Sequence, residues 1–103
     1  MVIIRREVGD VLRERRRHQG RTLRQVSSDA AVSLGYLSEV ERGEKEASSE
    51  MLATICRALE LPVSQMLNDV AVRVAIAEAE EAVNVPDSPA NMPLGGPPEQ
   101  VLR

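Results

Sequence analysis

The chain has 103 residues, of which 43% are hydrophobic and 28% charged, and its formal net charge is −3. It contains one Cys, one His and one aromatic residue, Tyr36, so a disulfide framework, a Cys-based zinc site and a His-paired metal site are excluded. No apolar stretch approaches the roughly 18 residues that span a membrane, and the N-terminus lacks the order of a signal peptide. We therefore expect one compact, mainly helical intracellular domain that is not an enzyme and binds no cofactor or metal.

The two halves of the chain differ in charge. Residues 1–45 carry ten Lys or Arg and seven Asp or Glu, a balance of +3, whereas residues 46–103 carry three and nine, a balance of −6. A basic half can approach a polyanion while the acidic half stays away from it. An ordinary solvated helix face also explains a run of charges, so the assignment has to come from the sequence pattern.

The first predicted helix spans residues 5–19. Val8, Val11 and Leu12 have the spacing of one buried helix stripe. Gly20 follows directly and is a favoured helix terminator. The helix therefore has one face for a core and leaves its arginines on the others.

A pair of short helices over 23–30 and 34–42 is predicted next, separated by only three residues. Thr22 is a favoured N-cap with Gln25 as its capping-box partner, and Ser33 caps the following helix. Two short helices joined by so tight a turn form a helix-turn-helix, whose second member is short enough to lie in a DNA major groove.

Two further helices are predicted over 49–60 and 63–83. The first begins at Ser48 or Ser49, and the second begins just after Pro62. The second helix carries two apolar stripes that lie about 140° apart around its axis. An expected core stripe comprises Val63, Leu67, Val70 and Val74, and the other stripe comprises Val72, Ile76, Ala79 and Val83. Steps of four and three residues are typical of a helix–helix seam, so we interpret the other stripe as a dimerisation surface, with burial inside one chain as the alternative.

The last segment, residues 84–103, contains five of the six prolines and two adjacent glycines. This composition is typical of a disordered tail, and such termini are where degradation by proteases starts. The predicted organisation is a helix-turn-helix domain over 1–67, a helical extension over 68–83 and the tail. The tail is thereby a candidate protease target.

The helix-turn-helix region resembles the Cro/CI-type regulators, also called the XRE family. The matching segments are 20–22, 32–33 and 40–43, the last of which contains Glu41-Arg42-Gly43. The resemblance covers about residues 8–67 and implies an all-α, five-helix fold like that of lambda repressor. More narrowly, segments 20–23, 32–43 and 45–50 are similar to actinobacterial regulators of Clp protease genes.

This resemblance implies a sequence-specific, DNA-binding transcriptional regulator. The narrower similarity implies a homodimeric activator of Clp protease and stress-response genes, acting on a two-half-site operator in the cytoplasm and associated with the nucleoid. RNA polymerase is then a further expected partner, although the residues themselves leave activation or repression open. The positions implied to contact DNA are Arg21, Thr22, Leu23, Arg24, Ser33, Leu34, Gly35, Tyr36, Ser38, Glu39, Arg42 and Lys45. Arg16 and Glu41 occupy the positions of a buried ion pair between the first and third helices.

Individual roles follow from side-chain chemistry. The cations expected at phosphates are Arg21, Arg24, Arg42 and Lys45, and Thr22 and Tyr36 are expected to contact phosphates as well. Glu39 is expected either to accept a hydrogen bond from a cytosine amino group or to pair with a neighbouring cation, Arg42 or Lys45. Leu23, Leu34 and Gly35 stand where the family often has Gln, Arg or Ser, so direct hydrogen-bonded readout of bases is expected to be sparse.

Two other classes of protein remain as alternatives. An antitoxin combines a helix-turn-helix domain with a segment that neutralises a toxin, and here the tail over 84–103 is the candidate segment. A protein-binding adaptor would use the same fold without DNA. The basic first half and the small residues Gly35 and Ser38 argue against the adaptor.

Overall fold

The computed structural model describes residues 1–84, which form five helices and contain no strand. The helices are α1 (Ile4–His18), α2 (Leu23–Ala30), α3 (Leu34–Glu41), α4 (Ser49–Ala58) and α5 (Val63–Asn84). Each agrees with its predicted range to within two residues at either end, and the predicted all-α, five-helix class is confirmed. The predicted tail lies, apart from its first residue, outside the described residues.

Side-chain caps start the second, third and fourth helices. The Thr22 hydroxyl accepts a hydrogen bond from the Gln25 amide at 3.1 Å, and the Gln25 side chain accepts one from the Thr22 amide at 2.9 Å. Ser33 accepts from the backbone amide that lies three residues ahead at 3.0 Å, and Ser48 does the same at 3.2 Å. Of the two serines expected to cap α4, Ser48 is therefore the one that does so.

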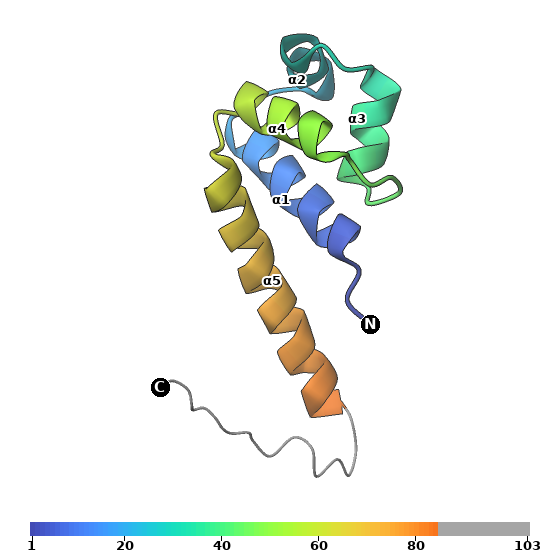
Figure 1. Cartoon of the computed structure of the whole chain (residues 1–103), viewed down its shortest axis with the longest axis vertical. Helices are drawn as coiled ribbons and strands as arrows, with labels where there is room; N and C mark the ends of the chain where they lie inside the picture. Colours follow the sequence, from blue (N-terminus) through green and yellow to red (C-terminus); the bar gives the residue numbers. More distant parts are fainter. Residues whose placement is uncertain (85–103) are drawn as a thin grey trace.

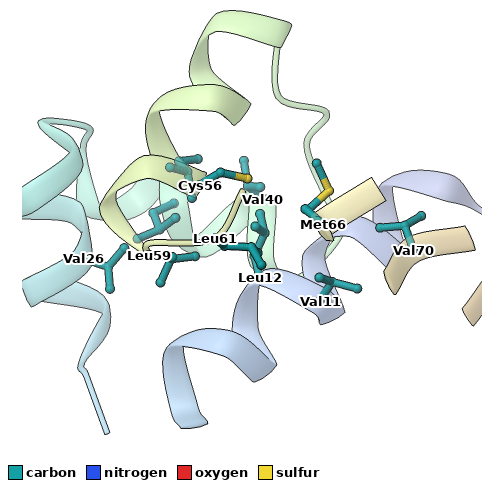
Figure 2. Close-up of a cluster of buried hydrophobic side chains, with 11 residues drawn as sticks. Val11, Leu12, Val26, Val40, Cys56, Leu59, Leu61, Met66 and Val70 are labelled. Atoms are coloured by element: carbon teal, nitrogen blue, oxygen red, sulfur yellow. The ribbon is translucent and has the colours of Figure 1, made fainter. Parts of the chain in front are cut away.

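The core lies between α1, α2, α3, α4 and the first half of α5, and Figure 2 shows its side chains. Five of its large side chains are fully buried: Leu12, Leu37, Ile55, Leu59 and Met66. Cys56 lies among them, and burial raises the pKa of its thiol. The thiol thus stays protonated near neutral pH, as expected of a small core residue.

The predicted core stripe of α5 is partly wrong. Val63 and Leu67 are 40% and 56% exposed, whereas Met66 and Val70 are buried. Val74 packs against the core, as the prediction had it. Apolar residues occur around much of the α5 circumference, so their spacing did not identify the face that meets α1.

Helix α5 runs alongside α1 and then projects beyond the body of the domain (Figure 1). Arg73 ties the two helices together, because its guanidinium donates to carboxylates of Glu7, Asp10 and Glu14 on α1 at 2.8–3.3 Å. These three acids recur along one side of α1 at helix spacing. Residues 1–84 contain no helix long and apolar enough to cross a membrane, and no group of side chains suited to a metal ion.

Candidate nucleic-acid interface

Helices α2 and α3 form the predicted helix-turn-helix at the end of the molecule away from the C-terminus of α5 (Figure 1). Three residues separate them, and Ala31 makes the turn by adopting a left-handed conformation with a φ of 57°. The buried side of α3 is formed by Leu37, Val40 and Glu41, which face the rest of the domain. The opposite side of α3 is therefore available to a partner.

The outward side of α3 begins with a large apolar residue followed by a glycine. Leu34 and Gly35 are exposed, and the space beside the Gly35 α-carbon is open, with no heavy atom within 4 Å of where a Cβ would stand. Ser38 and Glu39 follow one turn later and are half-buried. The small residues Gly35 and Ser38 let the helix backbone approach the edges of base pairs closely, and Leu34 offers an apolar contact beside them.

An ion pair anchors this helix to α1. The Arg16 guanidinium donates to both carboxylate oxygens of Glu41 at 2.7 and 2.9 Å, and it donates to the Arg21 carbonyl at 2.9 Å. Arg16 is 9% and Glu41 4% exposed. The hydrogen bond from Arg16 to Glu41 raises the pKa of the Arg16 guanidinium, although burial opposes this shift. The pair expected at these positions is thus present, and it fixes α3 relative to α1.

Two capping residues lie where the family positions predict DNA contacts. The hydroxyls of Thr22 and Ser33 cap α2 and α3. Both residues are exposed, so the N-termini of the two helices lie at the surface. Such N-termini favour anions such as phosphate. Arg24, in the first turn of α2, is exposed and forms no ion pair within residues 1–84. Leu23 and Tyr36 are half-buried against the core, so each presents only part of its side chain outward.

Arg21 is held by the protein itself. Its guanidinium donates to the Ala58 carbonyl at 2.7 Å and to the Gln19 side chain at 3.2 Å, and it pairs with Asp29. Arg15 also donates to carbonyls at the end of α4, at 2.7 and 3.3 Å. Sequence analysis missed this capping of α4, whose only signal was the density of arginines before and after Gly20.

At the C-terminal end of α3, the cations are paired with acids. Arg42 donates to both carboxylate oxygens of Glu44 at 3.0 Å each and also to the Ser38 hydroxyl. The hydrogen bond between Arg42 and Glu44 raises the pKa of the Arg42 guanidinium and lowers the pKa of the Glu44 carboxyl. The Lys45 ammonium lies 3.4 Å from a carboxylate oxygen of Glu39. Of the two partners considered for Glu39, the structure thus pairs it with Lys45.

The second stripe of α5 lies on the surface. Val72, Ile76 and Val83 are 53%, 55% and 83% exposed, and Ala79 is exposed beside them. Within residues 1–84 this stripe is not covered by the chain's own side chains. Within residues 1–84, the alternative interpretation, burial of the stripe inside a single chain, is not observed.

Comparison with known proteins identifies the family. A family model described as a helix-turn-helix domain matches residues 7–67. The transcriptional regulator ClgR of Mycobacterium tuberculosis is 60% identical over 76 residues, which are 74% of this chain and 68% of that relative. The chain belongs to the ClgR family of helix-turn-helix transcriptional regulators. The resemblance stated from the sequence is thereby confirmed, as is the class of DNA-binding regulator.

Solved structures agree with this assignment to the ClgR family. The crystal structure of the clp gene regulator ClgR from Corynebacterium glutamicum matches with a TM-score of 0.75 and 42% identity, covering 81% of this chain and 88% of that one. The restriction-modification controller protein C.Esp1396I matches with a TM-score of 0.67 over 72% of this chain and 95% of its own, at 18% identity. The latter likeness shows a shared fold.

Proposed function

We propose that the chain activates transcription of Clp protease and stress-response genes by binding a two-half-site operator as a homodimer. The observation that carries this proposal is the outward side of α3, where open space surrounds Gly35, in a chain 60% identical to ClgR of M. tuberculosis. The name of the C. glutamicum relative, a clp gene regulator, supports the choice of target genes. The antitoxin alternative gains no support from these relatives.

In the proposed complex, α3 lies in the major groove of the operator. Leu34 contacts a thymine methyl group, Ser38 hydrogen-bonds a base edge, and Glu39 accepts from the amino group of a cytosine. Arg24 and the N-terminus of α2 at Thr22 bind phosphates beside the groove. With few donors on α3, phosphate contacts and DNA shape carry much of the recognition.

The proposed homodimer forms through the exposed stripe of α5. A two-fold axis would bring the same stripe of each copy together, so that the apolar side chains of the two helices cover one another. The proposed extension over 68–83 continues the same helix, α5, that begins in the DNA-binding domain. Val70, near the start of the extension, is buried in the core, whereas Ile76 further along is 55% exposed. In this dimer the two α3 helices would lie about 34–36 Å apart, one turn of DNA.

Binding to promoter fragments tests the proposed targets. The purified chain should bind fragments upstream of Clp protease genes at least about a thousandfold more tightly than unrelated DNA, because base contacts add to the phosphate term. The measurement is a salt titration with unrelated DNA as competitor, followed by a footprint, which should be palindromic. Weak and equal binding to all fragments would contradict the proposal and would favour a protein partner.

Ile76→Glu tests the dimer. A buried carboxylate in the middle of the apolar stripe opposes association, so we expect a folded monomer whose operator affinity falls by about a hundredfold, because the second half-site contact is lost. Sedimentation measures the oligomeric state, and circular dichroism checks the fold. Ala71→Glu is the matched control, since it adds the same charge to α5 at an exposed position outside the stripe. A dimer of unchanged strength in the Ile76 variant would rule out this seam.

A further inference from the structure

Three of the four cations expected at phosphates are paired with carboxylates of the protein itself. The pairs are Arg21 with Asp29, Arg42 with Glu44, and Lys45 with Glu39. Within residues 1–84, Arg24 is the one of the four that forms no ion pair. The surface around α3 therefore has much less free positive charge than its count of Arg and Lys indicates.

The Arg42–Glu44 pair has the geometry of a phosphate contact. Both carboxylate oxygens accept from the guanidinium at 3.0 Å, one from Nε and one from a terminal nitrogen. The same parallel pair of donors is what Arg uses to hold a phosphate, so a carboxylate and a phosphate cannot both occupy it. Arg42 also donates to the Ser38 hydroxyl, which keeps that hydroxyl engaged while the pair is intact.

Lys45 is engaged in a similar way. Its ammonium lies 3.4 Å from a carboxylate oxygen of Glu39 and 5.9 Å from the centre of the Tyr36 ring. Arg21 differs, since the Ala58 carbonyl also holds its guanidinium at 2.7 Å. Arg42 and Lys45 are therefore the two cations whose release depends on a single exposed carboxylate each.

We propose that Glu44 and Glu39 are internal competitors of DNA phosphate. They hold Arg42 and Lys45 in the free protein, so that a duplex of any sequence must replace a carboxylate before it gains the phosphate contact. Both pairs are about half exposed, so the exchange costs little and remains reversible. On DNA of arbitrary sequence, which lacks the cytosine contact proposed for Glu39 in the operator, the displaced carboxylate stays near the phosphates and repels them, which lowers the sequence-independent part of the affinity. This inference rests on the proposed function only in requiring that α3 faces DNA.

Glu44→Gln in the full chain tests the competition. We expect binding to a random-sequence duplex to tighten about two- to fivefold. The slope of log K against log salt should also become steeper by up to about 0.9, because Arg42 gains a phosphate. Fluorescence anisotropy of the labelled duplex measures both quantities. Glu78→Gln removes the same charge from the exposed surface of α5 and should leave affinity and slope unchanged.

A second variant shows whether Glu44 acts through Arg42. In an Arg42→Gln background, the further change Glu44→Gln should bring little gain and no change of slope, because the competing cation is gone. An equal gain with and without Arg42 would overturn the inference, as simple repulsion by the acid would then explain it. Equal affinity of wild type and Glu44→Gln, including binding of neither, would also overturn it.

The proposed function can fail independently of this inference. If the wild-type chain does not prefer Clp promoter fragments, while Glu44→Gln still tightens binding to the random duplex through Arg42, the target assignment is wrong and the competition stands. If the promoter preference holds and Glu44→Gln changes nothing, the target assignment stands and the competition is wrong.

Discussion

Glu41→Gln is expected to lower the free energy of unfolding by about 3–5 kcal/mol, because the Arg16 guanidinium then remains buried without its counter-charge. The amide keeps the size of the carboxylate, so packing changes little and the loss reports the charge. Urea denaturation at constant m-value measures it. Operator binding should fall in proportion to the folded fraction, because the pair holds α3 against α1.

Two comparisons separate the buried pair from an exposed one. The joint replacement Arg16→Met with Glu41→Leu should recover most of the lost stability, since it removes both buried charges at once. Glu44→Gln, which breaks the exposed pair with Arg42, should cost less than about 1 kcal/mol. A loss below 1 kcal/mol for Glu41→Gln as well would show that apolar contacts alone hold α3 in place.

Gly9→Ala is expected to destabilise the domain by about 3 kcal/mol through overpacking. A Cβ at Gly9 would lie 2.5 Å from the Val40 carbonyl oxygen and 2.6 Å from that of Glu41. Both neighbours are backbone atoms of α3, which cannot rotate away as a side chain can, so α1 and α3 would have to separate. Thermal and urea unfolding measure the change, and an unchanged midpoint would contradict this close helix crossing.

Gly35→Ala is the matched glycine substitution on the other side of α3. Nothing lies within 4 Å of its Cβ position, so alanine should stabilise the helix by up to about 0.5–1 kcal/mol. The added methyl group would stand on the surface proposed to enter the major groove, and it should weaken DNA binding while the fold becomes more stable. Opposite signs for stability and affinity are the expected result; a gain in both would place Gly35 outside the DNA contact.

Much of the fold follows from interactions between residues close together in the chain. The caps at Thr22, Ser33 and Ser48 involve residues three positions apart, and the terminator Gly20 acts on the turn that contains it. Such signals are visible in the sequence because both partners are neighbours there. The five helices and the helix-turn-helix were predictable for this reason.

The partners of the charged side chains were less predictable. Arg21 was expected at a phosphate, yet its guanidinium is held by the Ala58 carbonyl and Asp29, which lie 37 and 8 residues away. Arg73 meets three carboxylates of α1 that lie 59 to 66 residues away in the chain. A long cationic side chain can reach many acids, and spacing along one helix says nothing about those on another.

The sequence alone determined the order of the helices and the apolar stripe of α5 that is exposed, because apolar spacing and capping act within a few residues. Which face of α5 meets the core was decided only by tertiary packing, where Met66 and Val70 are buried and Val63 and Leu67 are not. The same holds for Arg21, which is held by the Ala58 carbonyl, whereas the pairs Arg42–Glu44 and Lys45–Glu39 join residues close together in the chain. Burial and ion pairing are properties of the assembled helices, because each depends on the solvent that the other helices exclude.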